Sequence, residues 1–254
     1  MVVASTDLPA MSIPQADAKV SAARGRSIAK IAMYSLAALI VAVYAAGVIW
    51  KMSGSNRWEL AAEKNGVTIY SLKAPGSALM QFKAVMIADF SLNHLIAGLI
   101  ENSNIDVCRK FIPACVDVQV IEPWSARTLS DSVMWTLQPP GPLARREIIL
   151  QSQVVQDPQT RQIIVDILAA PNKVPRNKGA VRVTHIQNRW IYTPLEDGKV
   201  RIEFLQDAEM GGMLPVWLQN LGGVNSTYQF IHDQLPALLD NPTLRQTKYD
   251  FIKD

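Results

Sequence analysis

Few residues in this chain are of the types and spacing that acid–base, metal or nucleophilic chemistry requires. The three histidines, His94, His185 and His232, are far apart in the sequence and form no short-spaced metal-binding pair. The chain contains no phosphate-binding loop, serine nucleophile elbow or Cys–His signature. A strand histidine such as His185 can act as a general base or make one polar contact to a ligand, and we favour the contact. We therefore expect no catalytic residues, no metal and no cofactor.

The two cysteines, Cys108 and Cys115, are seven positions apart. They can form a disulfide only if the turn between them brings their α-carbons within about 7 Å. The sequence leaves a disulfide and two half-buried thiols equally open.

The overall charge argues against nucleic acid as a partner. The 254 residues include 25 Lys and Arg and 22 Asp and Glu, and the first thirty carry four basic and two acidic residues. The remainder is therefore almost neutral, whereas a nucleic-acid-binding domain normally shows a concentrated basic face.

A membrane span is predicted near the N-terminus. Residues 31–50, "IAMYSLAALIVAVYAAGVIW", contain no charge, and twenty helical residues cross a hydrocarbon core of about 30 Å. Three basic residues at positions 24–30 precede the span, so the positive-inside rule places the N-terminus in the cytoplasm. The alternative is a signal peptide cleaved after Ala45. We expect an uncleaved single-pass anchor with its downstream domain in the periplasm of a Gram-negative host.

The chain is thus predicted to have five parts. Residues 1–27 form a disordered cytoplasmic tail, and 28–51 form the transmembrane helix. After a linker at 52–57, residues 58–240 form one domain, and 241–254 form a C-terminal tail.

The domain is predicted to be α+β, with a curved antiparallel sheet. "RWELAAEKNG" (57–66) is expected to form a brief helix, and "SLNHLIAGLIEN" (91–102) has helical spacing. Strands follow one another directly, which favours antiparallel pairing. They are expected at 67–73, 78–90, 116–122, 126–137, 145–156, 160–170, 180–194 and 199–207.

A long C-terminal helix is predicted to cover the concave face of this sheet. Apolar residues recur at spacings of three and four from Leu214 to Leu238 and include Trp217 and Leu221. Gly211 and Gly212 let the chain reverse before the helix. Gly222 and Gly223, in mid-helix, indicate either close packing against the sheet or a point of bending.

The run "KGAVRVTHIQNRWIYTPLEDGKVRIEFLQDAEMGGMLPVWLQN" (178–220) resembles the C-terminal half of START (StAR-related lipid-transfer) domains. The shared features are Val181-Arg182, Pro194, Asp207 and the pattern GG-x-L-P-x-W-L-x-N from Gly211 to Asn220. Two further segments are similar to START motifs, "GPLARREIIL" and "WELAAEKNGVTIYSLK", so that the resemblance covers about residues 56–240. The buried acid–base pair of some sterol-binding members has no evident counterpart.

This resemblance implies a helix-grip fold that encloses an apolar cavity and binds one lipid without catalysis. The lipid would be a phospholipid, a sterol or another hydrophobic molecule, taken from the membrane and passed to a lipid-handling partner or sensed. Gly211 and Gly212 would be the hinge of the helical lid. From strand parity and helix spacing, the expected ligand-binding residues are Trp135, Ile149, Val165, His185, Trp190, Phe204, Met213, Trp217, Leu221 and Tyr228.

Two alternatives remain at this stage. One is an enzyme of the same fold, cyclase- or hydrolase-like, that acts on a hydrophobic substrate and has clustered titratable groups in its cavity. The other is a scaffold whose interior is filled by its own side chains. A basic loop, Lys173 to Lys178, is further expected to dock onto anionic lipid headgroups. The sequence names neither the lipid nor the oligomeric state.

Overall fold

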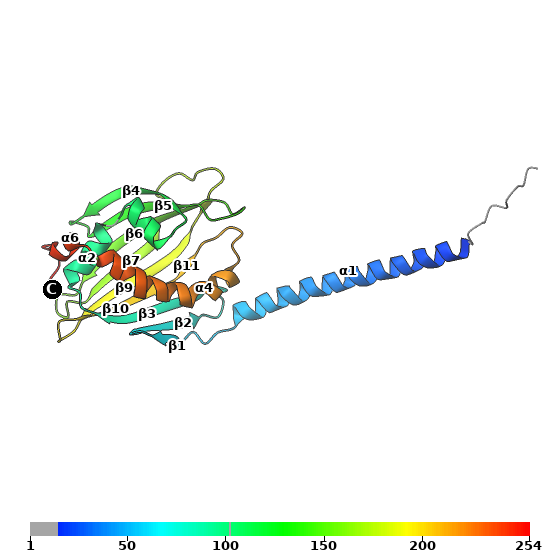
Figure 1. The fold of residues 1–254 in the computed structure, drawn as a ribbon, viewed down its shortest axis with the longest axis horizontal. Coiled ribbons are helices and arrows are strands. Elements are labelled where there is room, and N and C mark those ends of the chain that lie inside the picture. The colour runs from blue at the N-terminus through cyan, green and yellow to red at the C-terminus, as the bar shows by residue number, and fades with distance from the viewer. Residues whose placement is uncertain (1–14, 102) are drawn as a thin grey trace, which may run out of the picture. The chain divides into compact units, whose positions relative to one another are not determined.

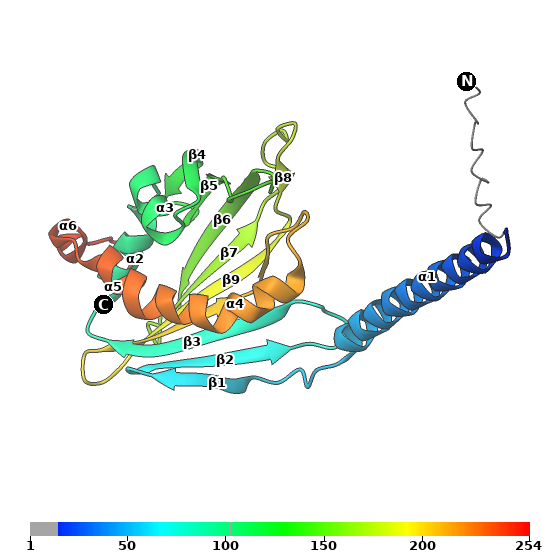
Figure 2. The same cartoon turned by 45° about the vertical axis from the view of Figure 1, so that its right-hand side comes forward.

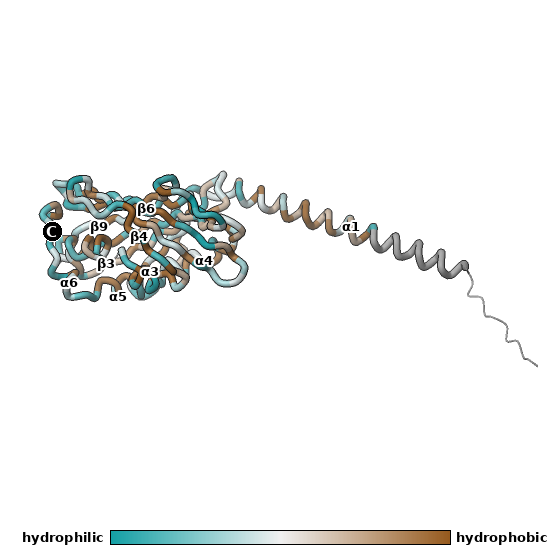
Figure 3. The backbone as a smooth tube through the Cα atoms, turned by 90° about the horizontal axis from the view of Figure 1, so that it is seen from above, coloured by the Kyte–Doolittle hydropathy of each residue, from teal (hydrophilic) through white to brown (hydrophobic). Residues whose placement is uncertain are grey.

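The computed structural model describes residues 15–101 and 103–254, and the chain divides into two units between Trp50 and Lys51. The first unit holds most of helix α1 (Gln15–Met52), whose segment Lys30–Met52 is long and apolar enough to cross a membrane (Figure 3). Residues 15–27 were expected in a disordered tail but belong to α1, because their Ala, Lys and Arg residues favour helix. The rest of that tail, 1–14, lies outside the described residues.

The second unit is built on one sheet of eleven strands (Figure 1). The main path runs β1-β2-β3-β10-β9-β7-β6-β5-β4, and every neighbouring pair in it is antiparallel. β11 pairs with β9, and β8 runs parallel to β6. The strands are β1 (Glu59–Lys64), β2 (Val67–Lys73), β3 (Met80–Ala88), β4 (Cys115–Ser125), β5 (Ser130–Leu137), β6 (Arg146–Gln156), β7 (Ile163–Ala169), β8 (Val181–Arg182), β9 (His185–Pro194), β10 (Val200–Gln206) and β11 (Ala208–Glu209).

The C-terminal helix lies across one face of this sheet (Figure 2), which confirms the α+β, helix-grip architecture. We call this face the inner face. The helix has three parts, because a π-helical segment interrupts it. Besides α1, the helices are α2 (Leu92–Ile100), α3 (Ile105–Phe111), α4 (Val216–Gln229), η1 (Phe230–Gln234), α5 (Leu235–Leu239) and α6 (Pro242–Gln246).

The π-helical segment explains why the predicted apolar stripe was wrong in its first half. The buried positions of the helix are Gly223, Thr227, Ile231, Leu235 and Leu239. A π-turn inserts an extra residue per turn and keeps these positions in phase along the sheet. A regular helical period cannot account for this shift of phase. It predicts that Trp217 and Leu221 face the sheet, whereas both are exposed to solvent.

The predicted helix at 57–66 was also wrong, because residues 59–64 form the edge strand β1. These residues are mostly exposed, so neither face of the segment carries a burial pattern. Pairing with β2, from Glu59 opposite Ser71 to Lys64 opposite Val67, overrides the helix propensity of "ELAAEK". Lys83 places its ammonium 5.1 Å from the ring of Trp58, just before the strand.

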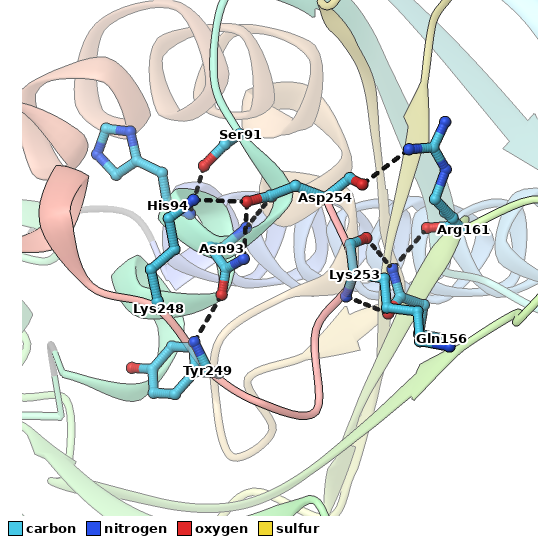
Figure 4. A network of polar contacts seen from close by, with 9 residues as sticks. All are labelled: Ser91, Asn93, His94, Gln156, Arg161, Lys248, Tyr249, Lys253 and Asp254. Atoms are coloured by element: carbon cyan, nitrogen blue, oxygen red, sulfur yellow. Dashed lines mark hydrogen bonds and ion pairs between the residues drawn. The ribbon is translucent and has the colours of Figure 1, made fainter.

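The final residues of the chain pack onto the domain rather than forming a free tail (Figure 4). The Asp254 carboxylate accepts hydrogen bonds from the backbone N–H and the side-chain amide of Asn93 in α2, at 3.0 and 2.8 Å. The Arg161 guanidinium donates to the Asp254 main-chain oxygen at 2.7 Å, and Ile252 is buried. The compact unit therefore extends to residue 254 instead of ending at 240.

A disulfide joins Cys108 in α3 to Cys115 at the start of β4, with α-carbons 6.0 Å apart. Both half-cystines are buried in an apolar cluster with Val133 and Ile148. The bridge therefore fixes α3 against the sheet. At the end of α3, the Phe111 ring makes an edge contact with Phe230 of the C-terminal helix.

Candidate functional site

The inner face carries two separate apolar clusters. Cross-strand register places Val154, Val165, Trp190 and Phe204 in one row that faces the C-terminal helix. These residues form the larger cluster with α2, η1 and α5. The smaller cluster lies near α3 and includes Val133, Leu137, Ile148, Leu150, Val183 and Ile186.

A row of residues that are polar except for Ile167 of β7 crosses the inner face between these clusters. Asp131 of β5 is opposite Ser152 of β6, Ser152 is opposite Ile167 of β7, and Ile167 is opposite Asn188 of β9. Ile167 packs against both clusters, so this row marks their boundary.

Gln206 and Thr227 continue this polar row from the sheet to the lid. The Asn188 side-chain oxygen accepts from the backbone N–H of Asp207, at 3.0 Å, next to Gln206 at the end of β10. The Thr227 hydroxyl of α4 donates to the Gln206 side-chain oxygen at 2.9 Å. The five side chains Asp131, Ser152, Asn188, Gln206 and Thr227 are called the polar row below.

Asp131 is the most unusual member of the polar row. Its side chain is 8% exposed, and its Oδ1 atom has no hydrogen-bond partner. Burial raises the pKa of Asp131 above its usual value, and the hydrogen bond with Ser152 only partly offsets this. A buried acceptor without a donor costs about 1–3 kcal/mol, so this carboxyl group is a poor choice for a purely structural position.

The structure places five of the ten predicted ligand-binding residues on the inner side. Trp135 shares the parity of Asp131 and Val133 on β5, and Val165, Trp190 and Phe204 belong to the main row. Tyr228 of α4 packs against the larger cluster. The aromatic rings meet there: Trp190 and Phe204 have centroids 4.3 Å apart, and Phe204 and Phe230 have centroids 5.1 Å apart.

The other five face elsewhere, which corrects their assignment to the interior. Ile149 and His185 lie on the outer face, because the position number of each differs by an odd number from that of an inner-face residue on its own strand, Leu150 and Trp190 respectively. Met213, Trp217 and Leu221 are 65–78% exposed, on the solvent side of the lid. Sequence parity missed Asp131, although "SDSVMW" (130–135) sets this acid in phase with Val133 and Trp135.

His185 takes part in a polar cluster on the outer face. Its Nε2 atom is 2.7 Å from Oδ1 of Asp207, and the other Asp207 oxygen accepts from the Gln81 amide at 2.8 Å. Asp207 and Gln81 also line an outer hollow of about 270 Å³. This cluster ties the end of β10 to β3 and to the start of β9, immediately before the lid. Within residues 15–101 and 103–254, no group of three His, Cys, Asp or Glu side chains could hold a metal ion.

A buried ion pair anchors the loop at 171–180 to the outer face. Arg182 Nη2 is 2.7 Å from Glu147 Oε2, and both side chains are at most 3% exposed. The guanidinium also donates to the main-chain oxygens of Pro171, Val174 and Pro175. Burial acts to raise the pKa of Glu147, but hydrogen bonds from Arg182 and Asn177 outweigh it, so the pKa lies below its usual value.

The basic loop is only partly available for headgroups. Lys173 forms an ion pair with Glu122 and donates to the Ser132 hydroxyl at 2.8 Å, so it acts as a structural contact. Arg176 and Lys178 are exposed.

The linker before the C-terminal helix has the left-handed backbone conformation that its two glycines predict. Gly211 and Gly212 have φ values of +63° and +67°, in the left-handed region that favours glycine. A β-carbon on Gly212 would lie 3.0 Å from a Val181 methyl group, so this turn packs directly on β8.

These features, a curved antiparallel sheet with a C-terminal helix on its inner face, define the fold of START domains. No family model matches the chain. Among solved structures, a STAR-related lipid transfer protein from Xanthomonas axonopodis superposes with a TM-score of 0.61 and 21% identity, over 71% of this chain and 98% of that one.

Curated proteins that are similar in sequence include a mammalian lipid transfer protein and a bacterial protein. Phosphatidylcholine transfer protein of Rattus norvegicus is 26% identical over 187 residues, which cover 71% of this chain and 83% of the relative. The Pseudomonas aeruginosa protein PA1579 is 24% identical over 166 residues, which cover 64% of this chain and 77% of the relative.

Proposed function

We propose that this protein binds one lipid molecule between the inner face of its sheet and its C-terminal helix, and that it transfers or presents this lipid at a membrane without catalysing a reaction. The observation that carries the proposal is the polar row between two apolar clusters. An amphiphile bound there would place its chains against apolar side chains and its polar group on the row. The likeness to phosphatidylcholine transfer protein and to the Xanthomonas structure supports this function.

Asp131 specifies the chemistry of the ligand's polar group. An ionised carboxylate only accepts hydrogen bonds, and Oδ1 of Asp131 lacks a donor. A ligand with an ammonium or hydroxyl group near this atom would satisfy it. The ligand classes that fit are phospholipids with a cationic or hydroxylated headgroup and other hydroxylated lipids.

Ligand exchange requires the helix to move away from the sheet, and we place the hinge at Gly211 and Gly212. Their positive φ values exclude a proline test of this hinge, because proline fixes φ near −65° and would break the turn. Alanine at Gly211 is the milder variant: its β-carbon would contact only Val181, at 3.5 Å, although the positive φ strains any residue other than glycine and so costs some stability as well.

The cellular location that we propose follows from helix α1. We propose that Lys30–Met52 spans the bacterial inner membrane, with a cytoplasmic N-terminus and the lipid-binding unit in the periplasm. The basic residues before the span support this orientation. The Cys108–Cys115 disulfide supports an oxidising compartment.

Asp131→Asn tests the proposed site through two opposite effects. Without ligand, the variant should be more stable than the parent by about 1 kcal/mol at pH 7–8, because it removes a buried charge with an unmet acceptor. It should also retain less lipid. Measurements are the denaturant midpoint of lipid-stripped protein and the lipid content after purification. Asp117→Asn, at an exposed carboxylate of β4, is the control and should change neither.

The pH dependence provides an independent check. The folded-state pKa of Asp131 is raised above the ordinary value near 3.8. The unfolded state therefore loses this proton first as pH rises, and the parent loses stability between 3.8 and the folded-state pKa. The advantage of Asp131→Asn should accordingly be small near pH 4 and larger at pH 7. A variant that is less stable than the parent at pH 7 and holds lipid normally would show that Asp131 is structural.

A further inference from the structure

The strand ends divide unit 51–254 into two ends, and the chain enters the unit at one of them. Pairing sets Lys73 opposite Met80 and Gln206 opposite Phe82, so the turn 74–79 and the segment 207–215 share an end. Leu168 is opposite Gln187, and Leu137 is opposite Arg146, which brings the loops 171–180 and 138–145 to the same end. We call this the entry end; the turns 157–162 and 195–199 and the C-terminus lie at the other.

The chain that leaves the apolar helix is held at the entry end. The backbone N–H of Gly76 donates to the main-chain oxygen of Lys51 at 2.8 Å, and Lys73 Nζ donates to that of Ser53 at 3.0 Å. The beginning of α4 is tied to the same turn, because the Asn220 side chain donates to the Ala78 oxygen and accepts from the Met80 N–H, each at 2.9 Å. The first turns of the lid and the chain around the end of the apolar helix, Lys51 and Ser53, are therefore bound at one β-turn and the strand end before it.

An apolar patch is exposed at this end. Met213, Trp217, Leu218 and Leu221 are 78, 65, 44 and 77% exposed. They belong to one continuous segment of nine residues, whereas the other large apolar residues exposed in the unit are distributed over the end of α1 and the strands β1, β3, β4, β6 and β7. Contiguous apolar surface of this kind marks an interaction site.

The charge around the patch matches an anionic surface. The segments 74–79, 138–145, 171–180 and 207–221 contain four basic residues and two acidic ones, Asp207 and Glu209, which are only partly exposed. Arg145, Arg176 and Lys178 are exposed. Turns at the opposite end are mixed, with Asp157 and Arg161 in one and Glu196, Asp197 and Lys199 in another.

We propose that the entry end is a docking surface for the lipid bilayer, in which Met213, Trp217, Leu218 and Leu221 insert among the headgroups while Arg145, Arg176 and Lys178 contact anionic lipid. The bilayer is the favoured occupant because Lys51 and Ser53, which lie at the C-terminal boundary of the proposed span in the sequence, are hydrogen-bonded at this end. Docking would bring the Gly211–Gly212 turn and the start of the lid to the membrane surface, where lipid must enter or leave. This docking surface consists of exposed residues at the entry end, so the proposal does not depend on lipid binding in the interior.

Site-directed fluorescence tests this surface in the full chain. Both native cysteines form the disulfide, so Leu221→Cys offers a single reactive thiol. The protein is reconstituted in vesicles of phosphatidylcholine and phosphatidylglycerol and then labelled from outside with an impermeant, environment-sensitive dye. We expect a blue shift at position 221 and strong quenching by lipid that carries a nitroxide on its acyl chain. Glu196→Cys, at an exposed position of the opposite end, is the control and should show neither effect.

Reversing the charge of the exposed basic residues at the entry end is the second part of this test. Replacing Arg145, Arg176 and Lys178 by Glu should remove most of the quenching at 221, since each basic residue contributes about fivefold to binding at an anionic surface. The matched control reverses Arg127 and Lys199 at the opposite end and should leave the quenching unchanged.

Two results would overturn the proposal. Equal quenching at 221 and 196 would mean that the entry end does not dock. A blue shift at 221 without lipid quenching would mean that protein, such as a second copy of the chain, covers the patch. Lipid content, measured on the same variants by mass spectrometry, separates a failure of docking from a failure of lipid binding in the interior.

Discussion

Arg182→Met is expected to lower the free energy of unfolding by about 3–5 kcal/mol, since it leaves the Glu147 carboxylate buried without its ionic partner. Both side chains are at most 3% exposed, and the guanidinium also holds three main-chain oxygens of the loop 171–175. The loss should therefore combine an unpaired buried charge with release of this loop. Chemical denaturation, followed by tryptophan fluorescence, measures it.

The chain contains a matched surface pair for comparison. Arg189 Nε is 2.6 Å from Asp166 Oδ1, but the Arg189 side chain is 48% exposed. Arg189→Met should therefore cost no more than about 1 kcal/mol. The double variant Glu147→Gln, Arg182→Met should be more stable than the two single losses predict, because neither charge is then left alone. Equal costs at the two arginines would contradict the account of the buried pair.

Gly223→Ala is expected to destabilise the domain by about 1–3 kcal/mol, the usual cost of overpacking a tight contact. A β-carbon at Gly223 would lie 2.0 Å from the ring of Phe82, which is itself buried, so helix or ring must move. Because this contact presses α4 onto β3, the variant should also exchange lipid faster. Thermal unfolding and transfer of a fluorescent lipid between vesicles measure the two effects.

The neighbouring glycine is the natural control. A β-carbon at Gly222 meets no atom within 4 Å, so Gly222→Ala should be neutral or stabilise the helix by up to about 1 kcal/mol. Adding Phe82→Leu should restore part of the stability lost in Gly223→Ala. Identical behaviour of the two alanine variants would show that α4 does not pack on β3 through Gly223. Of the two sequence interpretations of this glycine pair, the structure supports close packing at Gly223.

The sequence predicted the strand series, the terminal helix and the reversal at Gly211–Gly212, because alternation, helical spacing and paired glycines are local signals. Sequence prediction failed where the structure of a segment depends on other segments of the chain. The edge strand 59–64 forms because β2 offers an open edge, and the exposed position of Trp217 follows from the π-helical segment near 230. Neither effect can be read from composition within the segment itself.

Prediction of the site residues was limited in two ways: strand faces were assigned wrongly at two positions, and one buried acidic residue was not considered. Parity placed Val165, Trp190 and Phe204 on the inner face. It failed at Ile149 because the phase of β6 was not known, and at His185 because this residue is five positions from Trp190 on the same strand and therefore faces the opposite side. Asp131 was overlooked because an acid within an apolar strand is usually taken to face solvent. Its burial becomes visible only when β5 is aligned with β6, where Ser152 is its neighbour.

Native mass spectrometry of residues 51–254, which form one compact unit, tests the central claim most directly. The protein would be purified without detergent from a bacterial host and then incubated with vesicles made from a total lipid extract. The account predicts one discrete added mass that corresponds to a single lipid, reduced in Asp131→Asn and unchanged in Asp117→Asn. Protein that emerges without lipid from both the host and the vesicles would contradict the proposal that its interior is a lipid-binding site.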